Sequence, residues 1–392
     1  MKQHVYIIGS KGIPARYGGF ETFVDNLTKY QTNKEIKYHV ACLYQKGDKK
    51  GDKETYLYNN AECFVIKVPE IGAAKAVVYD ILAFHRCIRD IRKNKIKSPI
   101  IYVLACRMGP FIWYYKLRLK LLGGKYYVNP DGHEWKRDKW NSLVKKYWKI
   151  SERMMIKHSD LAICDSVNIE HYIKNEYKQY APKTTFIAYG ADIDNSKLTE
   201  EDDSVKNWYQ DKGITLHNYY LLVGRMVPEN NYETILREFV KSKSEKDLVI
   251  ISTNPSAKFE KQLRDNTEYY KDKRVKFVGT VYDRELLKFI RENAFAYIHG
   301  HEVGGTNPSL LEALGSTKLN ILLDVGFNKE VARDGALYFN KAEGNMMKTL
   351  EKAEGLSEQE IDELSVKAKA RIREHYSHLI IEEKYERIFG KK

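Results

Sequence analysis

Short apolar runs alternate with longer amphipathic segments along most of this 392-residue chain. Clear examples are Val5–Ile8 and Ile100–Leu104 in the first half, and Tyr219–Val223 and Ala294–His299 in the second. Strands separated by helices of about 10–15 residues pair in parallel through right-handed crossovers, so the pattern predicts parallel sheets covered by helices. The chain is too long for one ordinary core, and we therefore expect two α/β domains of the doubly wound, Rossmann-like kind.

The two expected domains meet near Phe186–Ser196, where a short apolar run gives way to turn residues. The clearest predicted helices are Phe20–Tyr30 in the first half and Lys258–Asn266 and Arg284–Glu292 in the second. No apolar run reaches the roughly 20 residues of a membrane span, and no charged-then-apolar leader precedes the first strand. The five cysteines have no zinc-like spacing, which favours reduced thiols in a cytoplasmic protein.

Positive charge is concentrated in the first half of the chain. Residues 1–190 contain 34 Lys and Arg against 18 Asp and Glu, a net charge of +16, whereas the remainder carries −3 of the total +13. Anionic partners for this half include nucleic acid, a phospholipid surface and a phosphorylated substrate.

A glycine loop follows the predicted strand Ala294–His299 and leads into a helix. Its residues are Gly304, Gly305, Thr306 and Asn307. Pro308 suits the first turn of the helix, because the N–H that proline lacks has no partner there. Glycines let backbone amides approach a ligand closely, and a helix N-terminus attracts anions, so the loop is a candidate diphosphate site. Glu312, one turn into the helix, could reach a polar part of the same ligand. The alternative is an ordinary glycine turn between strand and helix.

Two further loops have the same character. Gly18 and Gly19 precede a helical segment after the first strand, but the spacing is not that of a dinucleotide-binding loop. Arg225 follows the strand Tyr219–Val223, where its guanidinium could bind a diphosphate at the carboxyl edge of the sheet. An ordinary turn at Gly18–Gly19 and a surface ion pair at Arg225 are the alternatives.

The segment Asn129–Trp135 (NPDGHEW) leaves another predicted strand through turn-forming dipeptides. This places Asp131 and His133 at the carboxyl edge of the first sheet, where a carboxylate could orient a sugar hydroxyl or act as a base. Asp131 could instead cap the turn through its own backbone. No acidic cluster accompanies His299 or His301, so no metal site is expected.

The segment Gly109–Lys125 combines large apolar side chains with basic ones. The residues of the expected interfacial surface are Trp113, Lys116, Arg118 and Lys120. Such a mixture is typical of a helix that rests on an anionic membrane. A core helix with a solvated basic face would show the same composition.

Together these residues resemble glycosyltransferase family 4, whose members have the GT-B fold. The resemblance rests on Gly18–Glu21, the strand before Arg225, Phe277–Gly279 before Tyr282, and the segment GGTNPSLLEAL that contains Glu312. These motifs extend over almost the whole chain. The segments KGIPARYGGFETFV and NPDGHEWKRDKW are similar to a narrower bacterial branch, which contains rhamnosyltransferases of cell-wall and capsular polysaccharide synthesis.

The resemblance implies two Rossmann-like domains that face a central cleft. Residues 1–190 would bind the acceptor, residues 191–375 the nucleotide sugar, and a helix within 376–392 would pack back on the first domain. Glu312 would bind the ribose and Tyr282 would lie beside the base. Arg225 and the amides of Gly304–Thr306 would hold the diphosphate, and no metal would be required.

Two positions depart from the family pattern. The family usually has two glutamates eight positions apart, but Gly304 occupies the upstream position here and Glu302 is displaced. A lysine usually follows the arginine near the diphosphate, and Asn230 stands in its place. Because the missing glutamate normally contacts donor hydroxyls, its absence fits a donor with a different hydroxyl face, such as a 6-deoxy sugar.

The resulting hypothesis is a retaining, metal-independent glycosyltransferase at the inner leaflet of the cell membrane. The expected donor is dTDP-β-L-rhamnose, and the expected acceptor is a sugar linked to undecaprenyl diphosphate. Alternatives are a transferase that uses a UDP-hexose, a sugar-nucleotide epimerase and a non-catalytic scaffold. A nucleic-acid-binding protein is disfavoured, because the sequence has no helix-turn-helix, zinc or RNA-binding signature. The oligomeric state is left open.

Overall fold

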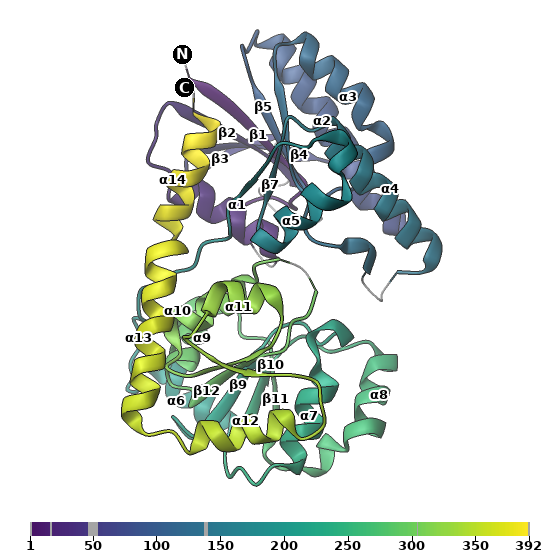
Figure 1. The fold of residues 1–392 in the computed structure, drawn as a ribbon. Helices are drawn as coiled ribbons and strands as arrows, with labels where there is room; N and C mark the ends of the chain where they lie inside the picture. Colours follow the sequence, from purple (N-terminus) through teal and green to yellow (C-terminus); the bar gives the residue numbers. More distant parts are fainter. Residues whose placement is uncertain (1, 16–17, 46–53, 137–139, 304, 391–392) are drawn as a thin grey trace. The chain divides into compact units, whose positions relative to one another are not determined.

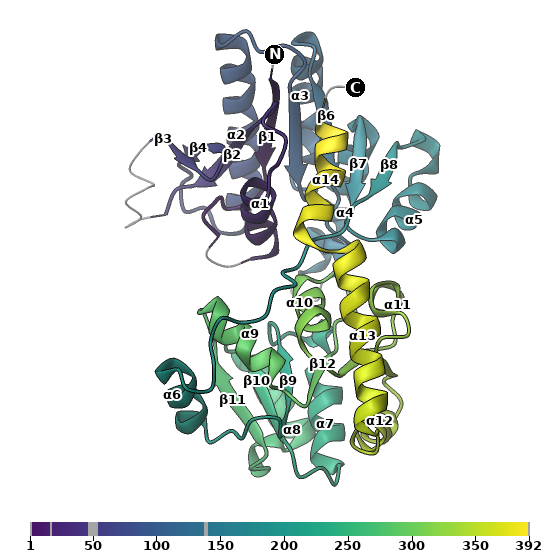
Figure 2. The same ribbon diagram turned by 90° about the vertical axis from the view of Figure 1, so that its left-hand side faces the viewer.

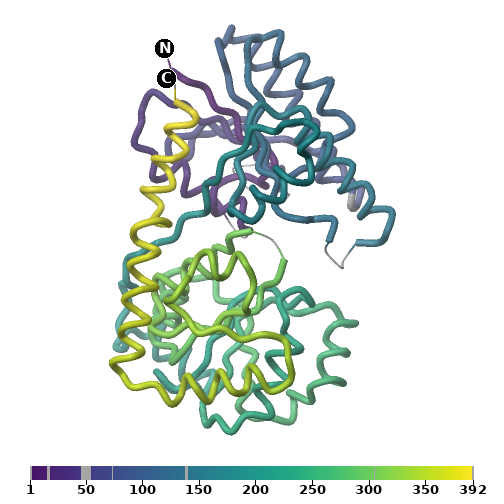
Figure 3. The backbone as a smooth tube through the Cα atoms, viewed as in Figure 1, coloured from purple at the N-terminus to yellow at the C-terminus, as the bar shows by residue number. Residues whose placement is uncertain are grey.

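The computed structural model describes residues 2–15, 18–45, 54–136, 140–303 and 305–390. The chain forms two compact units (Figure 1): unit 1 comprises Met1–Gly190 and His378–Lys392, and unit 2 comprises Ala191–Ser377. The chain leaves unit 1 after Gly190 and returns to it at His378. Figure 3 traces the backbone from the N-terminus in purple to the C-terminus in yellow. The first and last residues of unit 2 lie close together, because the amide of Ala191 donates to the carbonyl oxygen of Tyr376 at 2.8 Å.

Unit 1 contains an eight-stranded sheet in the order β3-β4-β2-β1-β5-β6-β7-β8, parallel except for the edge strand β3. Its strands are β1 (Gln3–Ile8), β2 (Ile36–Leu43), β3 (Thr55–Tyr58), β4 (Ala61–Ile66), β5 (Ile100–Leu104), β6 (Lys125–Asn129), β7 (Leu161–Cys164) and β8 (Thr184–Phe186). Its helices are α1 (Gly19–Lys29), α2 (Lys75–Lys93), α3 (Gly109–Leu121), α4 (Ser142–His158), α5 (Val167–Glu176) and α14 (His378–Phe389), with short 3-10 turns η1 (Gly72–Ala74), η2 (Glu134–Lys136) and η3 (Lys178–Tyr180).

The helices of unit 1 cover both faces of its sheet. On one face, α2, α3, α4 and α5 contribute Phe84, Ile112, Met155 and Ile169 to a single buried cluster. Figure 2 shows α1 and α14 together on the other face. There Tyr385 of α14 packs against Phe23 of α1 and Tyr102 of β5, with ring centroids 5.2 and 6.0 Å apart. The last helix of the chain is therefore part of the first core.

Unit 2 contains a six-stranded, fully parallel sheet in the order β11-β10-β9-β12-β13-β14. Its strands are β9 (Tyr219–Val223), β10 (Asp247–Ile251), β11 (Val275–Gly279), β12 (Ala296–His299), β13 (Asn320–Leu323) and β14 (Leu337–Phe339). Its helices are α6 (Asp203–Lys212), α7 (Tyr232–Lys241), α8 (Ala257–Thr267), α9 (Arg284–Glu292), α10 (Pro308–Ser316), α11 (Gly326–Ala332), α12 (Asn345–Glu354) and α13 (Glu358–His375), with 3-10 turns η4 (Pro228–Asn230) and η5 (Tyr269–Lys271).

Two apolar clusters hold unit 2 together, one on each face of the sheet. Helices α7, α8 and α12 bury Phe239, Leu263 and Leu350 on one face. Helices α6 and α9 bury Tyr209 and Phe289 on the other. Both units thus have the parallel, helix-covered sheets that the alternating pattern predicts.

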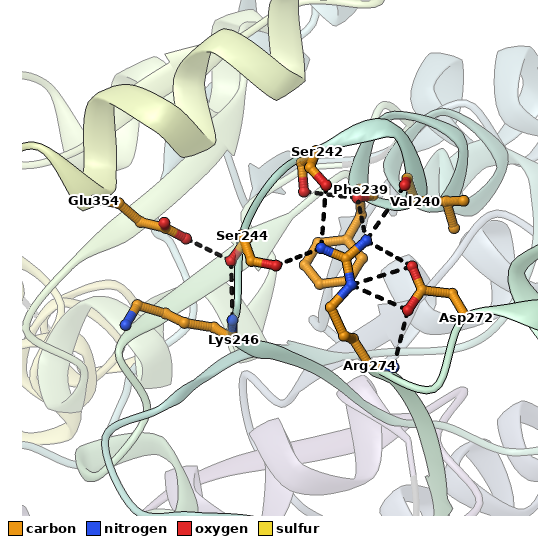
Figure 4. Close-up of polar contacts among 8 residues, drawn as sticks. All are labelled: Phe239, Val240, Ser242, Ser244, Lys246, Asp272, Arg274 and Glu354. Carbon is orange, nitrogen blue, oxygen red and sulfur yellow. Dashed lines mark hydrogen bonds and ion pairs between the residues drawn. The ribbon is translucent and has the colours of Figure 1, made fainter.

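Arg274, just before β11, closes the C-terminal end of α7 (Figure 4). Its Nη2 donates to the carbonyl oxygens of Phe239 and Val240 at 3.4 and 3.3 Å, and its Nη1 donates to that of Ser242 at 3.1 Å. Asp272 holds the guanidinium in this position through Nη2 at 2.6 Å. A cation is favourable here because the last carbonyl groups of a helix have no partners within the helix.

Among the described residues, none of the helices has the length and apolar character of a membrane span. All five cysteines are buried and none forms a disulfide.

Candidate functional site

Each sheet has one edge at which its parallel strands end, and ligands of open α/β sheets bind at such edges. In unit 2 this edge carries the loops after β9 and β12. The loop after β12 ends at Asn307, whose side chain caps α10 by accepting from the amide of Ser309 at 2.9 Å. Thr306 is buried, and Gly304 lies outside the described residues. The first turn of α10 contains no acidic residue, so no carboxylate of that turn offsets the positive end of the helix. The amides of Leu310 and Leu311 donate to the carbonyl oxygen of Asn307 at 3.1 and 3.2 Å.

Glu312 is held in place by an arginine that the sequence did not indicate. Arg291 of α9 is buried, and its Nη2 lies 2.7 Å from Oε2 of Glu312. The same nitrogen donates to Oγ of Ser309 at 3.4 Å, which in turn lies 3.0 Å from the hydroxyl of Tyr297. No described residue donates to the other carboxylate oxygen of Glu312. That oxygen is oriented and available to a ligand.

Arg225 follows β9 and is exposed. Its side chain forms no ion pair with any residue in the described ranges, which disfavours the alternative of a surface ion pair. Its backbone is held by Asn230, whose Nδ2 donates to the carbonyl oxygen of Arg225 at 2.7 Å. Asn230 is buried, so its amide nitrogen positions the loop.

The loop after β9 packs closely against the end of β12. A Cβ on Gly300 would lie 2.4 Å from the carbonyl oxygen of Asn230, so only glycine fits there. A Cβ on Gly224 would lie 3.1 Å from the ring of His301, which stacks on the buried ring of His299 at 4.2 Å. Burial, reinforced by the neighbouring His301, lowers the pKa of His299 well below its usual value, so His299 is neutral.

Two other predicted positions of unit 2 lie in different surroundings. Glu302 accepts from Lys341 at 2.6 Å and from Asn231 at 3.1 Å, so its carboxylate is already paired. Tyr282 lies in the loop between β11 and α9 and is 75% exposed, so its ring is free to stack on a base.

The glycine loop of unit 1 differs from that of unit 2. Gly18 precedes α1 with φ 128°, and Gly19 is the first residue of the helix. The carboxylate of Glu21 lies where a Cβ on Gly18 would be, and it accepts from the amide of Lys11 at 2.6 Å. The chain's own acidic group thus lies at the N-terminus of α1, a role that was not expected for this loop.

Asp131 and His133 lie together after β6, both with left-handed backbones at φ 59° and 49°. Non-glycine residues in this region are strained and concentrate at functional sites. The amide of Asp131 donates to Oδ1 of Asn129 at 2.7 Å. In this hydrogen bond of the turn, the accepting side chain is therefore that of Asn129. The His133 ring packs on Tyr172 with centroids 4.2 Å apart. Burial, with smaller effects of Lys136 and Lys149, lowers the pKa of His133 to about 4.

Arg107, after β5, is a candidate binding residue that sequence reasoning missed. Its Nη1 donates to the carbonyl oxygen of Gly9 at 2.7 Å and lies 3.3 Å from Oδ2 of Asp80, which is fully buried. Burial raises the pKa of Asp80 to about 6, although Arg107 opposes that rise. In the sequence, Arg107 is a single arginine after a predicted strand, and no pair of glycines accompanies it. It therefore did not stand out as a candidate.

Helix α3 presents large apolar side chains to solvent. Its buried face consists of Gly109, Ile112, Tyr115 and Leu119. The exposed apolar residues, with their exposed fractions, are Phe111 (47%), Trp113 (53%), Tyr114 (44%), Leu117 (52%) and Leu121 (79%). Lys120 is also exposed, Arg118 lies 5.6 Å from the Tyr114 ring centroid, and Lys116 is paired with Asp160. The solvent-exposed side of α3 is thus both apolar and basic. In a core helix with a solvated basic face, the large apolar side chains would be buried.

The described residues contain no group of three or more His, Cys, Asp or Glu side chains arranged to hold a metal ion.

Two stretches of the sequence match protein families. Residues 2–192 match a domain of unknown function, DUF1972, and residues 205–375 match Glycosyl transferases group 1. Among curated proteins, none matches the chain.

Solved structures with the same fold extend over the whole chain. A sucrose-phosphate synthase from Thermosynechococcus elongatus has a TM-score of 0.79 at 14% identity, over 99% of this chain and 98% of that one. HepE from Anabaena, in complex with UDP, has a TM-score of 0.69 at 12% identity over 99% of each chain. An α,α-trehalose-phosphate synthase (UDP-forming) from Burkholderia vietnamiensis has a TM-score of 0.73 at 11% identity, also over 99% of each. The likeness confirms the predicted two-domain GT-B fold.

Proposed function

The chain is a group 1 glycosyltransferase with an N-terminal DUF1972 domain, and on this basis we propose that it moves L-rhamnose from dTDP-β-L-rhamnose to a saccharide carried on undecaprenyl diphosphate. Transfer of a sugar from a nucleotide sugar follows from the family. The rhamnosyl donor is supported by the resemblance of KGIPARYGGFETFV and NPDGHEWKRDKW to the rhamnosyltransferase branch. The same resemblance supports a role in bacterial polysaccharide synthesis.

The observation that carries the proposal is the N-terminus of α10 at the carboxyl edge of the unit 2 sheet, which has no acidic residue in its first turn. Asn307 accepts hydrogen bonds from the amides of Ser309, Leu310 and Leu311, and no acidic side chain of the first turn offsets the positive end of the helix. Ser309 of this turn lies 3.4 Å from the carbonyl oxygen of Val223, two residues before Arg225. In the proposed complex, the positive end of α10, the amides of the loop before it and the Arg225 guanidinium hold the diphosphate of the donor without a metal ion.

The chemical step breaks the bond between the sugar's anomeric carbon and the diphosphate oxygen. Negative charge grows on the diphosphate as the bond breaks, and preorganised donors lower the energy of that state. The departing phosphate oxygen takes the proton of the acceptor hydroxyl on the same face of the sugar, and the new glycosidic bond forms with retention. Glu312, oriented by Arg291, accepts a hydrogen bond from the ribose through its unpaired oxygen.

Asp131 and His133 are proposed to orient sugar hydroxyls at the edge of unit 1. With its pKa lowered to about 4, His133 is neutral at pH 7 and can both donate and accept a hydrogen bond. For Gly18 and Gly19, the Glu21 carboxylate at their helix makes a hydroxyl-bearing ligand more suitable than a phosphate.

We further propose that the apolar–basic face of α3 rests on the anionic inner leaflet and brings unit 1 to its lipid-linked acceptor. Trp113, Leu117 and Leu121 recur at helical spacing on the exposed side, and Lys120 and Arg118 flank them. Aromatic and leucine side chains insert at the headgroup boundary, and each nearby cation adds about 1 kcal/mol on an anionic surface.

The donor is tested by thermal unfolding of the full chain with dTDP-rhamnose, UDP-glucose, UDP-galactose and GDP-mannose. A ligand that binds only the folded chain raises the unfolding temperature, and dTDP-rhamnose is expected to give the largest rise. A rise with a UDP-hexose but not with dTDP-rhamnose would replace the rhamnosyl donor. Isomerised sugar formed from the donor alone would indicate an epimerase.

The membrane proposal is tested by sedimentation with vesicles that contain phosphatidylglycerol. Wild type should bind at low salt and dissociate as salt rises, and a Trp113→Ser, Leu117→Ser variant should bind at least about tenfold more weakly. The matched control is Leu57→Ser, because Leu57 is 80% exposed on the edge strand β3. Equal binding by both variants would contradict the proposal.

A further inference from the structure

We propose that Tyr172 is a positioning residue of the reaction: held by Glu152 and Lys149, it fixes the ring of His133 at which a sugar hydroxyl binds. The inference rests on the proposed function, because that proposal has His133 orient a sugar hydroxyl. It goes further by naming the side chains of two helices that set the position and the charge of this histidine.

The backbone of His133 is fixed, but its ring depends on what it packs against. The residue has a left-handed backbone at φ 49°, and its carbonyl oxygen accepts from the amide of Lys136 at 2.7 Å. Neither ring nitrogen forms a hydrogen bond with a residue in the parts of unit 1 that the structure describes. The orientation of the ring therefore comes from packing, and both nitrogens can meet a ligand.

The ring of Tyr172, on α5, supplies the closest aromatic contact of His133. The two ring centroids lie 4.2 Å apart with the planes tilted by 48°. Trp135 adds an edge contact at 5.9 Å. A functional side chain is held in one geometry when the groups packed against it are themselves fixed, so the next question is what fixes Tyr172.

The hydroxyl of Tyr172 is anchored by two side chains of α4. It donates to Oε1 of Glu152 at 2.5 Å and accepts from Nζ of Lys149 at 2.6 Å. Glu152 is buried and also accepts from the hydroxyl of Tyr177. Burial and the Glu152 carboxylate raise the pKa of Tyr172 above its usual value, so the hydroxyl keeps its proton and continues to donate.

Lys149 joins this anchor to the aromatic rings around His133. Its Nζ lies 4.7 Å from the ring centroid of Trp135 and 5.0 Å from that of Tyr172. The same nitrogen forms an ion pair with Glu176, at the end of α5, at 2.7 Å. An ammonium group over aromatic faces is attracted to them, so Lys149 holds both rings that contact the histidine.

The same surroundings keep His133 neutral. Burial is the largest effect, Lys136 and Lys149 repel a proton on the ring, and Glu176 acts in the opposite direction, so that the pKa is lowered to about 4. Tyr172 covers part of the ring and thus contributes to the burial. Only a neutral imidazole has a nitrogen that accepts a hydrogen bond. Removing the Tyr172 ring should therefore change both the position and the pKa of His133.

Three variants of the full chain separate the ring from the hydroxyl. Tyr172→Leu removes the ring, and Tyr172→Phe keeps the ring but removes the hydroxyl. Tyr177→Phe is the matched control, because Tyr177 donates to the same Glu152 oxygen and forms no ring contact with His133 among the described residues. Circular dichroism checks that each variant is folded. Nuclear magnetic resonance of histidine-labelled protein measures the pKa of His133, with His133→Gln used to assign its signal.

We expect Tyr172→Leu to raise the measured pKa of His133 by at least about one pH unit, because the ring loses cover. Tyr172→Phe should raise it by less than about half of that, and Tyr177→Phe should leave it unchanged. A His133 pKa in folded Tyr172→Leu that equals the wild-type value would overturn the inference.

Sugar transfer provides the second measurement. Tyr172→Leu should lower kcat at pH 7 by about tenfold or more while the KM of the donor stays within about twofold, and Tyr172→Phe should fall between it and wild type. Activity of Tyr172→Leu should also decline at a higher pH than that of wild type on acidification, because a protonated His133 no longer accepts a hydrogen bond. Tyr177→Phe should match wild type in both respects. An equal loss of kcat in Tyr177→Phe and Tyr172→Phe would contradict a specific role of Tyr172.

The double variant Tyr172→Leu, His133→Gln shows whether the tyrosine acts through the histidine. It should be about as active as His133→Gln alone, since the position of an absent imidazole no longer matters. Losses that multiply in the double variant would overturn the inference.

Failure of the proposed function has a different signature. Wild type that binds no nucleotide sugar would contradict that proposal, while the pKa measurement still decides whether Tyr172 governs the His133 ring. Wild type that transfers sugar, with His133→Gln equally active, would contradict only the inference.

Discussion

Units 1 and 2 both place a glycine loop before a helix at the carboxyl edge of a parallel sheet, yet the two helices begin differently. At α1, the carboxylate of Glu21 lies beside Gly18 and accepts from the amide of Lys11. At α10, the first turn has no acidic residue, and Glu312, one turn further along the helix, is paired with Arg291. A glycine loop before a helix is therefore not sufficient for an anion site. A carboxylate of the chain itself can occupy the same position, as Glu21 does at α1.

The arginines at the carboxyl edges of the two sheets also differ in how firmly the chain holds them. In unit 2, Arg225 is exposed and forms no ion pair among the described residues, so a bound anion would order it. In unit 1, Arg107 is fixed by Asp80 and Gly9 before any ligand binds. The candidate cation of unit 2 is thus exposed, whereas Arg107 of unit 1 is held in place by its neighbours.

The largest expected effect comes from removing the cation of unit 2. Arg225→Ala should lower kcat/KM for the nucleotide sugar by about 10²–10³-fold, since Arg225 is proposed to stabilise charge that develops on the diphosphate. Steady-state kinetics with the donor found in the thermal screen measure it. Arg264→Ala, on the exposed side of α8, should change the rate less than twofold. A similar loss in both variants would mean that Arg225 acts only through stability.

The second test separates Glu312 from the arginine that orients it. Glu312→Gln should raise the KM of the donor about tenfold, and Arg291→Met should do nearly the same, because Glu312 then loses its orientation. Combining the two should cost little more than either alone, with a coupling free energy of about 1–2 kcal/mol in the double-mutant cycle. Additive effects would show that Arg291 does not act through Glu312.

A third test concerns the response of unit 1 to pH. Burial, with a smaller contribution from Glu386, raises the pKa of Glu382 in α14 to about 8 from its usual 4.5. The folded chain therefore keeps a proton that the unfolded chain loses, so the stabilisation is full below about pH 4.5 and is lost as the pH rises through 8.

Glu382→Gln should remove this loss. Urea unfolding at pH 8.5 should show the variant about 1–2 kcal/mol more stable relative to wild type than at pH 5. The control Glu383→Gln changes an exposed ion pair with Arg387 and should shift stability by less than about 0.5 kcal/mol at either pH. A pH-independent difference between Glu382→Gln and wild type would contradict the prediction.

The smallest effect is expected at the N-terminus of α1, where the carboxylate of Glu21 lies beside Gly18. Glu21→Gln should destabilise the chain by about 0.5–1 kcal/mol, since the amide lacks the charge that the start of α1 favours. Nucleotide affinity should stay within twofold of wild type, because Glu21 belongs to unit 1. Urea unfolding and calorimetry measure the two quantities. A large loss of nucleotide binding would remove the contrast between the helices.

Much of the secondary structure could be predicted, because it depends on local pattern. The expected helix Arg284–Glu292 coincides with α9, and Phe20–Tyr30 is within one residue of α1 at each end. The edge strand β3 was missed because only alternate side chains of Thr55–Tyr58 are partly covered, so its sequence has no continuous apolar run. The apolar run of α3 was interpreted in two ways, and its exposed face favours the interfacial one.

The candidate site could be predicted only in part. The loop before α10, Arg225, and the pair Asp131 and His133 were identified because glycine, proline and turn dipeptides mark strand ends. Arg107 and Arg291 were not, because each owes its importance to a partner on another element. Asp80 lies 27 residues from Arg107, and nothing in either local sequence indicates the pairing.

The sequence by itself determined the doubled α/β plan, the places where loops leave the strands, and the concentration of positive charge in the first half. These properties depend on residue period and turn chemistry, which act over a few neighbouring residues. The tertiary structure decided which helix start has a carboxylate beside its glycine, which arginine is anchored and which carboxylate is paired. Those outcomes depend on side chains that the fold brings together from separate strands and helices, and the availability of an N–H group or a charge is settled only there.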